Sequence, residues 1–387
     1  MLIGGDSLAL RRSGIGRMTL EIARAARLDP AIAHVTLLMA DKMVDSALVD
    51  ALSDDEAGGR GPASWKVMLW RVPGVPTLLR LRHGRLSRRV RDLAAATPGP
   101  LVYHEPNMIA RPVRLPTVVT MNDLSWHYEP SWHPAERIRW IHRNLSRTLR
   151  QASRFAAISQ FTKDVVVRDL GVAADRIDVI PLAPAAGFRA MPFAEAQPVL
   201  ARYGLDDRGY VFSTSTLEPR KNFDRLLAAH LQLPPPLRVR APLVIAGGKG
   251  WGDVLARADA RSAVADGSVR LLGHVPDTDL AALCARAGVF AYPSLYEGFG
   301  LPVIEAMAAG CPVVASSTTA VGEIAAGAAV LVDPLDVPSI AEGLRQVLED
   351  PALATQLIAQ GQARAAEYTW QRTVAVLTGC WRRALAA

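Results

Sequence analysis

The stretch Glu297–Glu305 (E-G-F-G-L-P-V-I-E) decides the fold, because it has the pattern of a turn between a buried strand and a helix. The apolar run Val289–Tyr292 predicts the strand, and Val303–Ala309 predicts the helix. A glycine loop at this junction presents free backbone N–H groups to an anion, and the helix dipole adds to the attraction. Glu297 and Glu305 flank that position, and their carboxylates can accept hydrogen bonds from ligand hydroxyls. The alternative is an ordinary loop with one surface glutamate and one capping glutamate.

Short apolar runs and helical stretches alternate on both sides of this motif. Such alternation is typical of α/β proteins whose parallel strands are buried on both faces. The expected strands are residues 35–39, 101–104, 117–121, 154–159 and 177–181 in the first half of the chain, and 210–216, 243–248, 269–273, 289–293, 313–315 and 330–332 in the second.

Length and one irregular segment indicate two domains. At 387 residues the chain is too long for one ordinary hydrophobic core. The Ala- and Pro-rich segment Leu182–Gln197 lacks clean periodicity and is the linker candidate. We predict an N-terminal domain over residues 1–185, a linker over 186–208 and a C-terminal domain over 209–369. Ligands of such sheets bind at the carboxyl ends of the strands, facing a cleft.

Composition restricts the compartment and the partners. Lys plus Arg number 44 and Asp plus Glu 37, and this net charge of +7 suits phosphate-bearing ligands or an anionic membrane surface. The three cysteines are sparse and have no metal-ligand spacing, which favours a reducing compartment. No stretch has the pattern of a signal peptide or a membrane span. We predict a cytoplasmic protein, free or peripheral on the inner face of the membrane, with no nucleic-acid partner.

A second chemical segment is Thr216–Asn222 (T-L-E-P-R-K-N), between a predicted strand and a predicted helix that Asn222 would cap. Arg220 and Lys221 lie where a diphosphate leaving group would need positive charge, since arginine grips phosphate bidentately and lysine acts as a point charge. A solvated basic loop is the alternative. Gly14 and Gly16, which open a helical run near the N-terminus, could approach a phosphate or simply start a helix.

Together these segments resemble the retaining glycosyltransferases of family four, whose signature is E-x7-E. The resemblance also covers residues 13–17, 180–184, 215–222 and 273–276, and so spans nearly the whole chain. The sequence of Thr216–Asn222 is similar to that of the mannosyltransferase-like branch that builds bacterial surface polysaccharides. The resemblance implies the GT-B fold, in which two Rossmann-like domains face one another across a cleft. It also implies that residues 370–387 form a helix that packs back on the N-terminal, acceptor-binding domain.

The resemblance assigns roles to individual positions. Glu305 would bind the nucleotide ribose, Glu297 would contact the donor sugar, and Arg220 and Lys221 would hold the diphosphate. The implied catalytic positions are Glu297, Arg220 and Lys221, and the implied donor-binding positions are Glu305, Gly298, Phe299, Gly300, Leu301, Thr216, His274, Val275, Gly14 and Gly16. The family chemistry is metal-free and retaining, and it uses no cofactor besides the nucleotide-sugar donor.

The implied reaction is transfer of a hexose, with mannose from GDP-mannose favoured, to a glycan or a lipid-linked oligosaccharide acceptor in surface polysaccharide synthesis. A polyprenyl diphosphate is one option for the lipid. UDP-glucose and a nucleotide-activated rhamnose are alternative donors. A nucleotide-sugar epimerase and a non-catalytic nucleotide-sugar-binding protein of the same fold are alternative functions.

Some positions depart from the family pattern. This branch commonly has a His-Asp pair after the third strand of the N-terminal domain, where this chain has Asn122-Asp123. Asparagine can hydrogen-bond a sugar hydroxyl but cannot carry a proton or a charge near neutral pH. Val321-Gly322-Glu323 replaces the usual Leu-Pro-Glu. Asn122, Asp123 and His104, the last at a strand end, are the predicted acceptor or sugar contacts.

Three further patterns each allow two interpretations. The arginine-rich stretch Trp70–Arg91, which has no acidic residue, could rest on anionic lipid or be a solvated helix face. The aromatic residues between Trp126 and Trp140 could stack on acceptor sugars or pack in the core. Asp277-Thr278-Asp279 has the D-x-D form of some metal sites, but it precedes a helix and is better explained by capping. No metal site is predicted.

Overall fold

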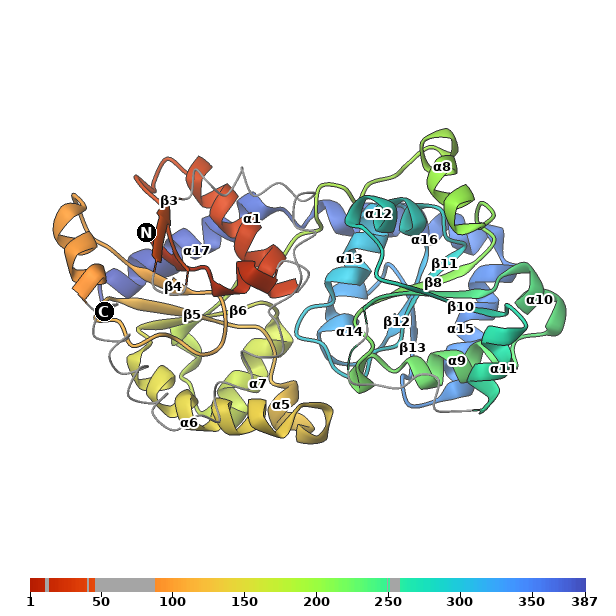
Figure 1. Cartoon of the computed structure of the whole chain (residues 1–387), viewed down its shortest axis with the longest axis horizontal. Coiled ribbons are helices and arrows are strands. Elements are labelled where there is room, and N and C mark those ends of the chain that lie inside the picture. Colours follow the sequence, from red (N-terminus) through yellow and green to blue (C-terminus); the bar gives the residue numbers. More distant parts are fainter. Residues whose placement is uncertain (11–13, 40–41, 46–87, 249, 251–257) are drawn as a thin grey trace.

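The computed structural model describes residues 1–10, 14–39, 42–45, 88–248, 250 and 258–387. The chain folds into two α/β domains that lie side by side along the long axis of the molecule (Figure 1). The prediction of two Rossmann-like sheets is confirmed. The predicted stretch Trp70–Arg91 lies mostly outside the described residues.

Among the described residues, the N-terminal sheet has seven strands in the order β3-β2-β1-β4-β5-β6-β7. All the described neighbours in it are parallel except β2 and β3, which pair in antiparallel fashion. The strands are β1 (Leu2–Gly4), β2 (Thr36–Met39), β3 (Lys42–Asp45), β4 (Tyr103–Glu105), β5 (Thr117–Met121), β6 (Arg154–Ala157) and β7 (Ile177–Val179).

The C-terminal sheet has six parallel strands in the order β10-β9-β8-β11-β12-β13. The strands are β8 (Val211–Thr214), β9 (Leu243–Ala246), β10 (Val269–Gly273), β11 (Val289–Tyr292), β12 (Val313–Ser316) and β13 (Val330–Val332). In each domain the strand order reverses beside the first strand, between β1 and β4 and between β8 and β11. These two reversal points are where a doubly wound sheet opens a crevice.

Helices cover both faces of each sheet, which is why the central strands are apolar along their whole length. The described helices of the N-terminal domain include α1 (Gly14–Leu28), α5 (Ser125–Tyr128), α6 (Ala135–Gln151) and α7 (Gln160–Leu170). Those that follow are α8 (Phe193–Tyr203), α9 (Phe223–Gln232), α10 (Pro235–Arg240), α11 (Ala258–Ala265), α12 (Asp277–Ala285), α13 (Leu301–Ala308), α14 (Thr319–Ala325), α15 (Val337–Glu349), α16 (Pro351–Ala366) and α17 (Trp370–Leu385). Among the described residues, no helix combines the length and the apolarity that crossing a bilayer requires.

The last helix, α17, returns to the N-terminal domain and packs against α1 and β6 (Figure 1). Its buried face carries Leu377, Cys380 and Trp381. The indole of Trp381 is 4% exposed, and its ring lies 5.6 Å from that of His104 on β4. The C-terminal helix therefore completes the hydrophobic core of the first domain.

Residues 193–203 form α8, a helix that lies inside the predicted linker and packs against α12. Pro198 within this helix disguised it, because a proline removes a backbone donor and is rare in helix interiors. Ala196 and Leu200 on its inner face are buried, and this burial stabilises the helix despite the proline.

Replacing Trp381 by alanine is expected to lower the free energy of unfolding by about 3–5 kcal/mol, because it empties a buried site under α17. Chemical unfolding followed by circular dichroism would measure the change. Trp140→Ala is the control, since Trp140 is 43% exposed and its loss leaves no buried cavity. Equal effects of the two substitutions would contradict the assigned role of α17.

Candidate active site

The loops that follow β8 and β11 meet at the carboxyl edge of the C-terminal sheet. β8 and β11 are parallel neighbours on either side of the point where the strand order reverses. Loops that leave such a point run in opposite directions and open a crevice for a ligand. Arg220 and Lys221 lie on the first loop, in the short 3-10 helix η5 (Pro219–Lys221), and Glu297 lies on the second.

Asn222 ties these two loops together. Its backbone is left-handed, with φ of 62°, a conformation that asparagine adopts more readily than most residues. Its side-chain amide donates hydrogen bonds to the carbonyls of Pro293, at 2.8 Å, and Pro334, at 2.6 Å. Asn222 occupies the predicted N-cap position of α9, but its side chain makes no capping hydrogen bond and instead fixes the position of the loop after β11.

Glu297 is the centre of a buried charged cluster. Lys221 Nζ lies 2.6 Å from Glu297 Oε1, and Arg220 donates to Glu297 Oε2 at 3.0 Å. The hydroxyl of Tyr292, at the end of β11, donates to Glu297 Oε1 at 2.9 Å and accepts from Lys221 at 2.8 Å. Glu218 binds the other side of the Arg220 guanidinium at 2.9 Å. The structure thus brings together the three residues predicted to be catalytic.

Electrostatics keep this cluster charged in spite of burial. Burial alone would raise the pKa of Glu297, but the positive charges of Lys221 and Arg220 outweigh burial and hold its pKa below the ordinary value. Burial and the adjacent Arg220 lower the pKa of Lys221. Because the carboxylate and both cations are fixed before any ligand arrives, the site needs little rearrangement to receive charge.

Asp123 joins the cluster from the N-terminal domain. Its Oδ1 accepts from the backbone N–H of Ser125 at 3.0 Å and from the Ser125 hydroxyl at 2.6 Å. Burial would raise the pKa of Asp123, but Arg220 and these hydrogen bonds lower it. Asn122 lies beside it, and its side-chain amide donates to the carbonyl of Pro106 at 3.0 Å. The predicted pair therefore lies at the cleft, directly opposite Arg220.

Gly298 is a point of close backbone contact between the two domains. A Cβ atom at this position would lie 1.7 Å from the carbonyl oxygen of Asn122, so only glycine fits. The Gly298 carbonyl accepts hydrogen bonds from the hydroxyls of Ser159, at 2.7 Å, and Thr162, at 3.0 Å, at the start of α7. The glycine loop thus anchors the C-terminal domain to the N-terminal one.

The helix that follows, α13, positions Glu305. Gly300 precedes it with φ of 105°, a backbone conformation that favours glycine, and Pro302 lies in the first turn. Glu305 is 3% exposed, and its Oε1 accepts from Arg17 of the N-terminal domain at 2.6 Å. Burial raises the pKa of Glu305, and Arg17 partly offsets that effect.

The remaining predicted donor positions surround this centre. Thr216 is exposed on the loop after β8. His274 is exposed and Val275 is buried just after β10, which β9 and β8 separate from β11. Phe299 turns its ring into the core, 5.7 Å from Tyr368, so only its backbone could face a ligand.

The N-terminal glycines lie at the start of α1. Gly14 faces the first residue of α13, since a Cβ added to it would lie 3.7 Å from the side chain of Leu301. Gly16 is buried in the same turn. Both therefore lie where the N-terminal domain meets the start of α13.

Comparisons with known proteins agree with this geometry. Residues 13–183 match a family model described as Glycosyltransferase Family 4, and residues 201–364 match one described as Glycosyl transferases group 1. The chain is 35% identical over 362 residues to O-antigen chain mannosyltransferase B of Escherichia coli, and the match covers 93% of each protein. The chain belongs to glycosyltransferase family 4. The predicted family and the predicted hexosyltransferase activity are thereby confirmed.

Other relatives of this glycosyltransferase are more distant. The serotype-specific mannosyltransferase WbdA of Escherichia coli is 28% identical over 383 residues, a match that covers 93% of this chain and 45% of WbdA. The solved structure of Anabaena HepE with UDP and glucose matches 98% of both chains with a TM-score of 0.68 and 18% identity. WaaG, a glycosyltransferase of lipopolysaccharide biosynthesis, matches 98% of this chain and 99% of its own with a TM-score of 0.66 and 14% identity. These structures establish the GT-B fold.

The glycosyltransferase does not present His104 to the cleft, so this predicted acceptor contact is corrected. His104 is fully buried, its Nε2 lies 2.8 Å from the Thr120 hydroxyl, and its ring packs beside Trp381 of α17. Burial lowers its pKa to about 3, which keeps the ring neutral. The reason is strand alternation, since neighbouring side chains on β4 point to opposite faces and His104 points toward α17.

The two acidic residues of Asp277-Thr278-Asp279 turn toward different partners. Asp277 pairs with Arg17 at 2.9 Å, whereas Asp279 pairs with Arg202 of α8 at 2.5 Å. Within the described residues, no group of three or more His, Cys, Asp or Glu side chains is arranged to hold a metal ion.

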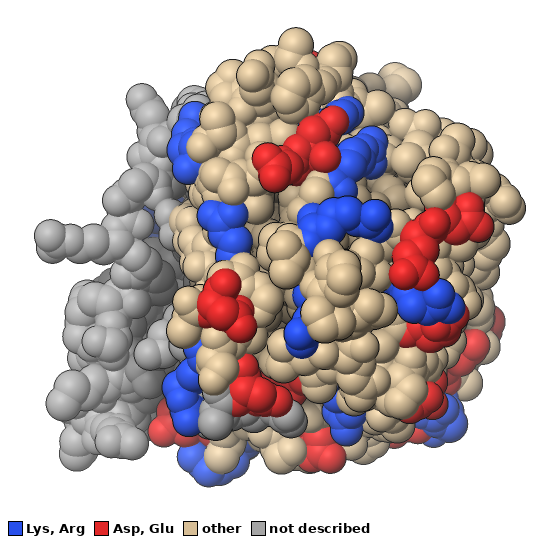
Figure 2. Space-filling model, turned by 90° about the vertical axis from the view of Figure 1, so that its right-hand side faces the viewer, with Lys and Arg blue, Asp and Glu red and all other residues tan. Residues whose placement is uncertain are grey.

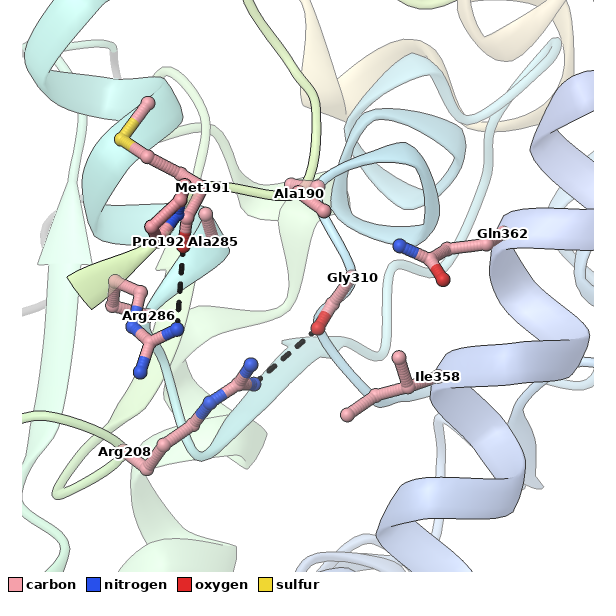
Figure 3. Close-up of a pocket in the computed structure, with 10 residues that line it drawn as sticks. Ala190, Met191, Pro192, Arg208, Ala285, Arg286, Gly310, Ile358 and Gln362 are labelled. Atoms are coloured by element: carbon pink, nitrogen blue, oxygen red, sulfur yellow. Dashed lines mark hydrogen bonds between the residues drawn. The ribbon is translucent and has the colours of Figure 1, made fainter. Parts of the chain in front are cut away.

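A cavity of about 280 Å³ lies on the C-terminal domain, away from the loop that carries Glu297 (Figure 3). It is located where α12 and α13 end, which is the edge of the sheet opposite to the loops of Glu297. Arg208 donates to the carbonyl of Gly310 at 3.3 Å, and Arg286 donates to that of Met191 at 3.3 Å (Figure 3). Arg208 thereby satisfies a carbonyl just after the C-terminus of α13, and Arg286 satisfies one just before the start of α8.

Sequence reasoning missed two residues that the structure brings to the site. Arg17 was considered only as part of a glycine motif. Tyr292 lay hidden in an apolar strand, and its position at the end of that strand was the available signal. Glu105, the neighbour of His104, lies at the carboxyl end of β4, beside the reversal point of the N-terminal sheet. Its carboxyl accepts from the Tyr103 hydroxyl and from the backbone N–H of Asn107.

Replacing Glu105 by glutamine is expected to remove a pH dependence of stability near neutrality. Burial raises the pKa of Glu105 from 4.5 to about 7. A carboxyl whose pKa rises on folding gives its full stabilisation below its unfolded-state pKa and loses it as the pH rises through the folded-state value. The melting temperature of the wild type should therefore fall, relative to that of Glu105→Gln, between about pH 4.5 and pH 8. Parallel curves for the two proteins would show that Glu105 does not titrate in this range.

Proposed function

We propose that this glycosyltransferase transfers mannose from GDP-mannose to a growing, lipid-linked surface glycan, with retention of configuration. The observation that carries the proposal is the buried cluster in which Lys221, Arg220 and Tyr292 hold the carboxylate of Glu297 at the reversal point of the sheet. The mannosyltransferases among its relatives, O-antigen chain mannosyltransferase B foremost, favour mannose as the sugar. UDP-glucose and a nucleotide-activated rhamnose are the alternative donors.

In the proposed reaction the C-terminal domain binds the donor. Glu305 accepts hydrogen bonds from both ribose hydroxyls, because an ionised carboxylate has two acceptor oxygens. Arg220 and Lys221 stabilise the diphosphate as the bond from the anomeric carbon to the phosphate oxygen breaks. They do so in place of a metal ion. Glu297 contacts the sugar, where it orients the hydroxyls and stabilises positive charge at the anomeric carbon.

In this proposal the N-terminal domain binds the acceptor. The acceptor hydroxyl attacks the anomeric carbon on the face that the diphosphate leaves, and its proton passes to the leaving phosphate oxygen. Asn122 and Asp123 are close to the donor loops on that side, since the Asn122 carbonyl lies against Gly298 and Asp123 faces Arg220. Asp123 is held ionised and in one orientation by Ser125, so it can accept a hydrogen bond from a sugar hydroxyl.

Replacing Glu305 by alanine is expected to weaken GDP binding at least tenfold, because each hydrogen bond to a charged group contributes about 1.5–3 kcal/mol. Isothermal titration with GDP and UDP would measure the affinity and identify the nucleotide. Glu342→Ala is the matched control, since Glu342 pairs with Arg345 on the surface of α15. Unchanged affinity of Glu305→Ala would refute the ribose contact, and preference for UDP would refute GDP-mannose as donor.

A lipid-linked acceptor requires contact with a membrane surface, and among the described residues α6 suits that contact. Arg139 and Arg143 are exposed one turn apart, and Trp140 between them is 43% exposed. Basic side chains beside an exposed tryptophan favour the headgroup region of an anionic bilayer. By contrast, the outer end of the C-terminal domain intermixes acidic and basic side chains (Figure 2).

Reversing two charges on α6, in the variant Arg139→Glu with Arg143→Glu, is expected to reduce binding to anionic vesicles about tenfold or more, since each basic residue near the surface contributes about 1 kcal/mol. Co-sedimentation with vesicles of phosphatidylglycerol and phosphatidylcholine would measure binding. Arg345→Glu, on the C-terminal domain, is the control. Equal binding of all three proteins would exclude α6 as the contact.

A further inference from the structure

Arg17 crosses from the N-terminal domain to the proposed ribose-binding carboxylate. It lies in the first turn of α1, and its guanidinium donates to Glu305 Oε1 at 2.6 Å and to Asp277 Oδ2 at 2.9 Å. These two carboxylates belong to different helices of the C-terminal domain. Asp277 begins α12, and Glu305 lies within α13. One cation from the first domain therefore joins two anions of the second.

This ion pair uses one oxygen of the Glu305 carboxylate, the group proposed to bind the nucleotide ribose. A ribose diol offers two hydroxyl donors, and a carboxylate satisfies both when both of its oxygens are available. Here Oε1 of Glu305 is already bound by Arg17 in a buried setting, where a charged hydrogen bond is strong and its loss is costly. Arg17 has 21% of its side chain exposed, and Glu305 has 5%. A donor must therefore displace Arg17 or share Glu305 with it.

Asp277 offers the guanidinium a second partner. It lies at the first position of α12, where a negative charge is favoured, and its side chain is 60% exposed. Arg17 can thus leave Glu305 and remain paired with Asp277 at the rim of the cleft. Arginine suits this exchange because its planar fork binds two carboxylates at once and releases one without becoming unpaired.

We propose that Arg17 is an interdomain latch that competes with the nucleotide ribose for Glu305, and that Asp277 retains the guanidinium when the ribose displaces it. The inference rests on the proposed ribose role of Glu305. The latch lowers the apparent affinity for the nucleotide by the fraction of molecules in which Glu305 is free. It also couples donor binding to the contact between the domains, because the same carboxylate serves both.

A different contact between the domains provides the comparison. Glu323 of α14 accepts hydrogen bonds from the backbone N–H groups of Gln160, at 3.1 Å, and Phe161, at 2.9 Å, at the start of α7. It joins the two domains as Arg17 does, but it does not touch Glu305. Loosening the interface at Glu323 therefore leaves the ribose site unchanged.

The decisive variant is Arg17→Gln, which removes the charge and keeps a polar side chain. Its Kd for GDP, measured by isothermal titration, is expected to fall about fivefold or more, the lower end of typical coupling between two sites. Asp277→Asn should change the Kd less, since it weakens only the outer half of the latch. Glu323→Gln should leave the Kd unchanged. If Arg17→Gln binds GDP as the wild type does, or more weakly, the latch is refuted.

A double variant separates this inference from the proposed function. If Glu305→Ala alone leaves GDP affinity unchanged, the ribose role fails and the latch fails with it. If Glu305→Ala weakens binding, then Arg17→Gln should tighten binding in the wild-type background and have no effect in the Glu305→Ala background. Equal tightening in both backgrounds would show that Arg17 acts elsewhere. Arg17→Lys, which retains the charge but not the fork, should give a smaller gain and provides a second variant if Arg17→Gln is poorly folded.

Discussion

The absence of a side chain at Gly298 is the constraint on which the rest of the site depends. The Asn122 carbonyl occupies the place that a Cβ at residue 298 would need. The glycine loop can therefore contact the N-terminal domain here only if this residue is glycine. Ser159 and Thr162 then fix the Gly298 carbonyl, and Glu297 is held one residue earlier in the chain. A single methyl group here would separate Asp123 from Arg220 as well as distort the loop.

The charged side chains of the cleft are paired with one another. Arg220 lies among Glu297, Glu218 and Asp123, and Lys221 shares Glu297 with Tyr292. A buried ion pair contributes little net stability, because desolvation of both groups offsets their attraction. In this enzyme the ion pairs act by positioning. They hold two cations and a carboxylate in place, so that binding of a sugar diphosphate would not have to order these side chains.

Local pattern predicted the elements and the chemistry that neighbouring residues encode. The sequence revealed Glu297, Arg220 and Lys221 because each lies in a loop that directly follows a predicted strand. Arg17 could not be paired with Glu305 from sequence, because 288 residues separate them and only the packing of two domains brings them together. His104 was placed wrongly because a strand shows which residues alternate but not which face meets a helix. The helix α8 was missed because Pro198 broke its pattern while burial maintained its structure.

The docking of α17 also sets an order on how the protein can be made. β1 precedes the second domain in the sequence, yet the face of its sheet that holds Ala156 and His104 is covered by α17, which follows that domain. The first domain therefore cannot complete its core until the second has been synthesised, and contacts this distant in sequence form slowly. Until then an apolar surface stays uncovered on the nascent chain, and this is the surface on which a chaperone or an aggregate would form its first contact.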